Sequence, residues 1–204
     1  MPQRPSLSRS ELRKKEYQTR ISNAAIELFV EHGVEATTIK QIVSSAGVAH
    51  KTFFNHFPTK SHLLTYISSI YGGFTEAIFE NCLQLDVSAR EKLFVAFAEV
   101  AEGLLSIDER HVLMLKEILN GVGASPEESR LEQFNMVSGY VSKILHEARD
   151  EDTINPALPL DHYIDNVTQL FISTILIWCS VPGISLKARM RRTLEFIDAS
   201  VFVH

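Results

Sequence analysis

The chain has 204 residues, a length that suits one ordinary domain or two small ones and excludes a large multidomain enzyme. Hydrophobic residues make up 45% of it and charged residues 22%, values typical of a globular protein rather than of a disordered chain or a coiled-coil rod. The net charge of −5 hides an asymmetry, because residues 1–62 carry nine Lys or Arg against five Glu, a net of +4. The other eleven basic and twenty acidic residues leave −9 on residues 63–204, so phosphate-binding potential lies at the N-terminal end alone.

Cysteine usage and hydropathy predict a cytoplasmic protein without disulfides. Cys82 and Cys179 lie far apart in apolar stretches, which argues against a disulfide framework or a Cys-ligated metal. The basic N-terminus has no apolar run and so is not a secretory signal. The most apolar segment, 170–181, falls short of the ~20 residues needed to span a bilayer, and we expect no membrane contact.

Apolar residues recur at helical spacing in nearly every segment, and no run alternates as a strand would. We therefore expect an all-α fold of about nine helices. The first is expected at 10–32, ending at Gly33, and the second at 39–46 with Thr38 as its N-cap. A third helix at 49–56 ends before Pro58, and a fourth runs over 59–83 with Gly72 and Gly73 as a weak point inside it.

Two capping boxes predict later helix starts: Ser88 with Glu91, and Ser125 with Glu128. They begin helices at 88–106 and 126–149, and a helix at 108–120 between them ends at Gly121 and Gly123. After a proline-containing loop, the last two helices are expected at 160–181 and 185–203.

Residues 38–57, TIKQIVSSAGVAHKTFFNHF, have the pattern of a helix-turn-helix. Gly47 permits the positive φ that the turn needs, and Phe53 and Phe57 are spaced to pack inward. His50, Lys51, Phe54 and Asn55 then share the outward face, which can enter a major groove. There Asn can pair with adenine and Lys can donate to guanine, while Thr38 and Lys60, at helix starts, can hold phosphate.

The run IxxAAxxLFxExGxxxTTIxQIxxxAGVxxxTFFNHFPTKxxLL at 21–64 resembles the DNA-binding domain of the TetR family of bacterial transcriptional regulators. The resemblance implies a flexible basic tail at 1–9, a three-helix DNA-binding domain at 10–58 and a helical ligand-binding and dimerisation domain at 59–204. It also implies a homodimer on a palindromic operator in double-stranded DNA, released when a small molecule binds.

Carried over by position, the resemblance assigns DNA contacts to nine residues, of which Lys60 is the phosphate-binding lysine: Thr38, Lys40, His50, Lys51, Thr52, Phe54, Asn55, His56 and Lys60. Two positions depart from the family pattern. Ala49 stands where a capping Ser or Thr is common, and Phe54 where a Tyr hydroxyl often meets a phosphate. Both changes are expected to weaken individual DNA contacts without altering the motif.

The segment 170–178 is apolar nearly all round, which predicts a helix covered on both sides. We expect one face to pack on its own domain and the other in a four-helix dimer interface, the alternative being a monomer core that covers both faces. One predicted seam comprises Leu160, Ile164, Val167, Phe171, Thr174 and Trp178, and the other Leu186, Met190, Thr193, Ile197 and Val201. From the family resemblance, a pocket for a lipophilic small molecule is expected among Phe74, Phe97, Met114, Phe134, Tyr140 and Phe171, although filling the core is the better account for most of them.

No arrangement of nucleophile, base and orienting group suggests catalysis, and we expect neither enzyme activity nor a cofactor. His50, His56 and His62 recur every six residues, which places successive rings about 120° apart on a helix, so they do not converge on a metal. The rival hypothesis is a helical-bundle enzyme or lipid carrier whose N-terminal helices only pack. The charge asymmetry and the outward face of His50, Lys51 and Asn55 favour a ligand-responsive DNA-binding repressor instead.

Overall fold

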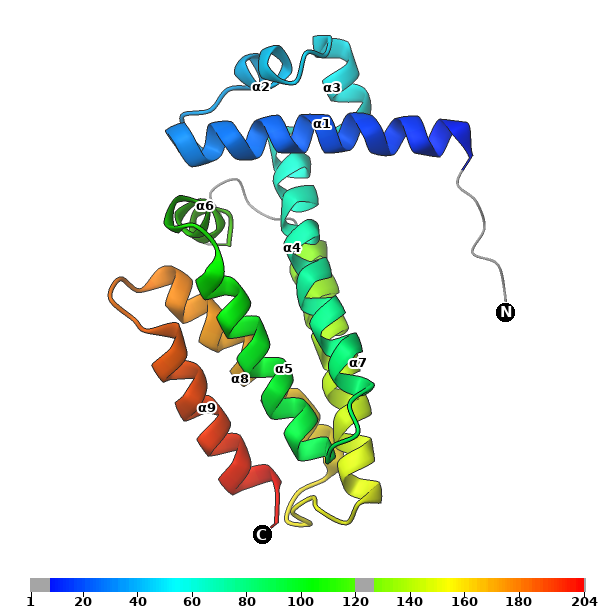
Figure 1. Cartoon of the computed structure of the whole chain (residues 1–204), viewed down its shortest axis with the longest axis vertical. Helices are drawn as coiled ribbons and strands as arrows, with labels where there is room; N and C mark the ends of the chain where they lie inside the picture. The colour runs from blue at the N-terminus through cyan, green and yellow to red at the C-terminus, as the bar shows by residue number, and fades with distance from the viewer. Residues whose placement is uncertain (1–7, 120–126, 204) are drawn as a thin grey trace.

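The computed structural model describes residues 8–119 and 127–203, and over these residues the fold is helical, as expected (Figure 1). The helices begin and end within two residues of the predicted positions. They are α1 (Arg9–His32), α2 (Ile39–Ser45), α3 (His50–His56), α4 (Lys60–Leu83), α5 (Ala89–Ser106), α6 (Glu109–Leu119), α7 (Glu127–Asp150), α8 (Leu160–Ser180) and α9 (Leu186–Val201).

Local capping explains where several helices start. In each capping box the N-cap hydroxyl accepts the third backbone N–H, while the third side chain accepts the N-cap N–H. The structure has three such boxes, formed by Ser8 with Glu11, Thr38 with Gln41, and Ser88 with Glu91. Gly33 and Gly47 adopt φ values of 84° and 61°, which confirms why glycine follows α1 and α2. The predicted box of Ser125 with Glu128 and the stop at Gly121 and Gly123 lie outside the described residues.

Buried side chains form two hydrophobic cores. The first combines α1, α2 and α3 with the start of α4 and the inner face of α6, and includes Ile21, Phe29, Ile42, Phe53, Leu63 and Met114. The second combines the later part of α4 with α5, α7, α8 and α9. The first core therefore extends beyond residue 58, where we expected the domain boundary.

Helix α4 runs the length of the molecule and joins the two cores (Figure 1). Its residues up to Tyr71 contribute to the first core, and its residues from Ile78 onward to the second. Gly72 and Gly73 lie between them, and a Cβ added at either position would meet nothing within 4 Å. The two glycines thus lie where the helix passes from one core to the other.

The predicted dimer seams are corrected by the structure, because they face the core of their own chain. Ile164, Val167, Phe171, Trp178, Met190, Ile197 and Val201 all belong to the second core, and none is more than 7% exposed. Trp178 also lies beneath the Lys116 ammonium of α6, which is 4.6 Å from its ring centroid. Sequence periodicity identified the buried stripes of α8 and α9 but not what covers them, since an intramolecular and an intermolecular partner require the same apolar pattern.

Candidate nucleic-acid interface

The turn between α2 and α3 is held against α1 by Arg20. Its Nη2 donates to the carbonyl oxygens of Ala46 at 2.9 Å and Gly47 at 3.3 Å. Phe53 and Phe57 bury the inner face of α3, with 0% and 2% of their surface exposed. Because the turn and this inner face are both anchored, α3 presents its opposite face in a defined orientation.

The outward face of α3 carries the four residues predicted there. His50, Lys51, Phe54 and Asn55 are all exposed, and Phe54 leaves 41% of its surface in solvent. The His50 and Phe54 rings lie 5.0 Å apart. An imidazole, an ammonium, an aromatic ring and a carboxamide thus share one surface, which suits base edges and thymine methyl groups in a major groove.

At the starts of α2 and α3, the structure shows which side chains cap the helix. Ala49 is the N-cap of α3 and provides no side-chain hydrogen bond, as expected from its methyl group. Thr38 is exposed but its hydroxyl already donates to Gln41 Oε1 at 2.7 Å and accepts from the Gln41 N–H at 3.3 Å. Thr38 therefore fixes the start of α2, and a phosphate contact there remains a prediction.

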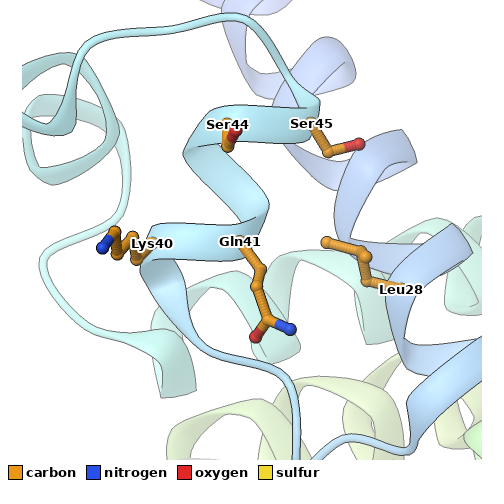
Figure 2. A pocket seen from close by; sticks show the side chains of 5 residues that line it. All are labelled: Leu28, Lys40, Gln41, Ser44 and Ser45. Atoms are coloured by element: carbon orange, nitrogen blue, oxygen red, sulfur yellow. The ribbon is translucent and has the colours of Figure 1, made fainter.

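Lys40 lies at the edge of an open depression of about 540 Å³ between α1 and α2. Leu28, Gln41, Ser44 and Ser45 line the rest of it. Figure 2 shows Leu28 reaching from α1 toward α2, while the Lys40 side chain extends away from α1. Lys40 is exposed and free to reach a phosphate beside the domain.

His56 and Thr52 are half-buried rather than fully presented on the outward face. The His56 ring packs 5.4 Å from the ring of Tyr17 on α1. Burial, together with the nearby Lys14 ammonium, lowers the pKa of His56 below its usual range, so the imidazole is neutral at physiological pH. This geometry gives His56 a packing contact with α1, and its DNA contact remains a prediction.

Lys60 is turned into the protein. Its Nζ donates to the carbonyl oxygen of Val34 and, at 2.6 Å, to that of Thr37. Burial lowers the pKa of Lys60. The predicted phosphate-binding lysine therefore holds the turn between α1 and α2, because that turn supplies carbonyl groups with no helical partner.

The same turn is held from the other side by Glu117 of α6. Glu117 Oε2 accepts the Val34 N–H at 2.8 Å across 83 positions of sequence. The sequence did not predict this role for Glu117, because the pattern of α6 does not indicate which polar group lies opposite it. The α1–α2 turn is thus clamped between charged side chains of α4 and α6.

The six predicted pocket residues lie in different parts of the described structure. Phe97 and Phe171 pack with ring centroids 4.3 Å apart, and Tyr140 stacks on Phe79 at 5.5 Å. Phe97 is 0% and Phe171 1% exposed, so no water-sized space adjoins either ring. These aromatic side chains fill the second core as the alternative interpretation expected.

The other predicted pocket residues lie elsewhere. Met114 belongs to the first core, and its place in a pocket remains a prediction. Phe74 is 48% exposed and covers Gly103, where an added Cβ would come within 2.5 Å of its ring. Phe134 is half-buried on α7.

Within residues 8–119 and 127–203, no group of three or more His, Cys, Asp or Glu side chains is arranged to hold a metal ion. None of the helices described has the length and apolar character needed to cross a membrane.

A helix-turn-helix domain joined by a long helix to a larger helical domain defines a class of DNA-binding regulators. Residues 21–67 match the family model described as bacterial regulatory proteins, tetR family. The match covers the helix-turn-helix part of the chain, which is therefore of the TetR type, as the sequence pattern indicated.

Relatives and solved structures agree with this assignment. Over 78 residues, or 38% of the chain, it is 38% identical to the HTH-type transcriptional regulator TcmR of Streptomyces glaucescens. Over 93 residues, or 46% of the chain, it is 27% identical to the HTH-type transcriptional repressor KstR2 of Rhodococcus jostii (strain RHA1). The chain spans 34% and 44% of the length of these two relatives.

The fold extends over nearly the whole chain. Thermus thermophilus FadR, a TetR-family transcriptional repressor solved in complex with lauroyl-CoA, superposes with a TM-score of 0.67 at 24% identity. The superposition covers 88% of this chain and 92% of that one, and it establishes a shared fold.

Proposed function

We propose that this protein is a transcriptional repressor that binds a palindromic operator as a homodimer and is released by a lipophilic small molecule. The exposed face of α3, with Lys51 and Asn55 at its centre, is the observation that carries the DNA-binding part. Residues 1–62 are basic and the rest of the chain is acidic, so a polyanion such as DNA attracts the N-terminal end. The relatives are regulators rather than enzymes, which favours this function over a carrier or an enzyme.

Selection of bound sequences from random duplexes tests the DNA-binding part directly. A palindromic product is expected, since a two-fold protein reads two equivalent half-sites. Lys51→Ala should weaken binding to the selected duplex, whereas Arg149→Ala, at the exposed end of α7, should not. Failure to enrich any sequence, or binding that does not weaken with salt, would refute the proposal.

The outer faces of α8 and α9 support the proposed dimer. They carry apolar side chains in solvent, with Leu176 40% and Phe196 60% exposed. The start of α8 bears the acidic Asp161 and Asp165, and α9 bears a basic pair, Arg191 and Arg192, all exposed. Opposite charges flanking an apolar centre suit a self-complementary, two-fold interface.

Sedimentation tests the dimer and its location together. The wild-type chain should sediment as a dimer at micromolar concentration, and Phe196→Asp should convert it to a monomer because the carboxylate would be desolvated in the interface. Leu85→Asp, at a leucine that is 40% exposed and lies outside α8 and α9, is the control. A monomeric wild type would refute the dimer, and an intact Phe196→Asp dimer would refute its location.

We infer that a lipophilic ligand binds at the packed aromatic cluster of Phe79, Phe97, Tyr140 and Phe171, which lies between α4, α5, α7 and α8. A ligand entering there has to displace packed rings, and such displacement can couple binding to a movement of α4. Acyl-CoA is disfavoured because its phosphates require clustered cations. The basic cluster of residues 63–204 lies on α9, where Lys187 pairs with Glu102 at 2.9 Å.

Screening lipophilic compounds for release of the protein from its selected duplex tests the ligand. An effective compound should lose potency with Phe97→Ala, which reshapes the cluster, but not with Leu85→Asp. Unchanged potency in Phe97→Ala would place the site elsewhere, and release by CoA-linked compounds alone would refute the ligand class.

A further inference from the structure

The first two turns of α1 extend beyond the helix-turn-helix domain. Every residue from Ser8 to Tyr17 is exposed, and Figure 1 shows this part of α1 continuing past α3 and α4. The capping box of Ser8 with Glu11 closes the end of the helix. The basic residues that we expected in a flexible tail up to Arg9 thus continue along an ordered helix.

Two contacts determine which side of this extension faces the DNA-binding surface. At the end of the extension, the ring of Tyr17 packs 5.4 Å from the ring of His56 on α3. Arg20 donates to Ala46 and Gly47 in the turn before α3. The side of α1 that carries Tyr17 and Arg20 therefore faces the recognition helix and its turn.

Helix geometry assigns the preceding residues to the same or the opposite side. At about 100° per residue, Arg13 lies about 40° and Lys14 about 60° from Tyr17 around the axis. Lys15 lies about 160° away, on the far side. The Lys14 ammonium is close enough to His56 to lower its pKa, which agrees with this placement.

We propose that Arg13 and Lys14 bind phosphates of the duplex that flank the sequence read by α3. The proposal rests on the DNA-binding function proposed above. Their side chains are exposed on the side of α1 that faces α3, and the ordered helix fixes their backbone without a further backbone entropic cost.

The chemistry of this surface favours DNA over a lipid bilayer. A helix that lies on a membrane needs an apolar face opposite its charged one. Leu12 is the large aliphatic side chain of the extension and is 54% exposed, but charged residues surround it. The extension therefore offers cations for a phosphate backbone and no hydrophobic stripe for a bilayer.

The test measures the salt dependence of affinity for the selected duplex with its flanking base pairs. Each phosphate contact contributes about −0.9 to the slope of log K against log salt concentration, so Arg13→Ala with Lys14→Ala should reduce that slope by about 1.8 in magnitude per chain. Lys15→Ala is the matched control, since it removes the same charge from the far side and should leave the slope unchanged. Arg13→Lys with Lys14→Arg should retain the wild-type slope.

Duplex length provides an independent measurement. Shortening the duplex to the selected sequence should reduce the wild-type slope to that of the double alanine variant, which itself should not respond to the shortening. An unchanged slope in the double variant, or an equal loss in Lys15→Ala, would overturn this inference while leaving the DNA-binding function intact. A wild type that binds no duplex would overturn both.

Discussion

Replacing Glu117 with alanine should release the α1–α2 turn from α6. In the wild type the Glu117 carboxylate accepts the Val34 N–H at 2.8 Å, and the Val34 side chain is buried. The other side of the turn stays bound to Lys60, which donates to the carbonyl groups of Val34 and Thr37. The substitution therefore removes one half of the clamp and leaves the other.

The size of the effect follows from the contact that is lost. An amide left without an acceptor in a part-buried site costs about 1–3 kcal/mol. Since about 1.4 kcal/mol corresponds to a factor of ten, local opening at Val34 should become roughly 5 to 150 times more frequent. Glu117→Gln keeps a neutral acceptor of the same shape and should show a smaller change.

Hydrogen exchange at the Val34 amide reports this opening directly. Exchange should accelerate in Glu117→Ala, less in Glu117→Gln and not in Glu27→Ala, which removes an exposed carboxylate from α1. The affinity of Glu117→Ala for the selected duplex should fall as well, because the turn positions the start of α2. Wild-type exchange at Val34 in Glu117→Ala would refute the clamp.

Four further predictions concern single residues. Asn55→Ala should cost about 1–3 kcal/mol on the selected duplex and little on random duplex, and equal losses in a binding assay would exclude a base contact. Phe97→Ala should destabilise the fold by about 3–5 kcal/mol in denaturant titration, since its ring is 0% exposed, and a loss below 1 kcal/mol would show that the core collapses around the site. Burial and the Glu80 carboxylate raise the pKa of Tyr140 to about 12. The protonated phenol therefore contributes to stability below pH 10, and this contribution is lost as the pH rises toward 12. Tyr140→Phe should lose less stability than the wild type over that pH interval. Gly72→Ala should stabilise the fold by about 0.5–1 kcal/mol in thermal unfolding, as should the equally unobstructed Gly139→Ala, and destabilisation would reveal that α4 bends at this position.

The start and end of most helices were predictable because they depend on neighbours within four residues. The hydroxyls of Thr38 and Ser88 cap their own helices, and Gly33 and Gly47 adopt the positive φ that ends a helix. The outward face of α3 was predictable for the same reason, since periodicity alone separates Phe53 from Asn55. Recognition of the TetR pattern depended on this same local spacing.

Tertiary structure decided what covers each helix and which charged groups meet. The buried stripes of α8 and α9 face their own core instead of a partner, and Met114 packs with the first domain although it follows the second domain's helices in sequence. Lys60 and Glu117 meet at one turn across 57 positions of sequence. Such contacts depend on how whole helices pack, and an apolar stripe or a lone charge has the same local pattern whatever lies opposite, so only the folded chain determines its partner.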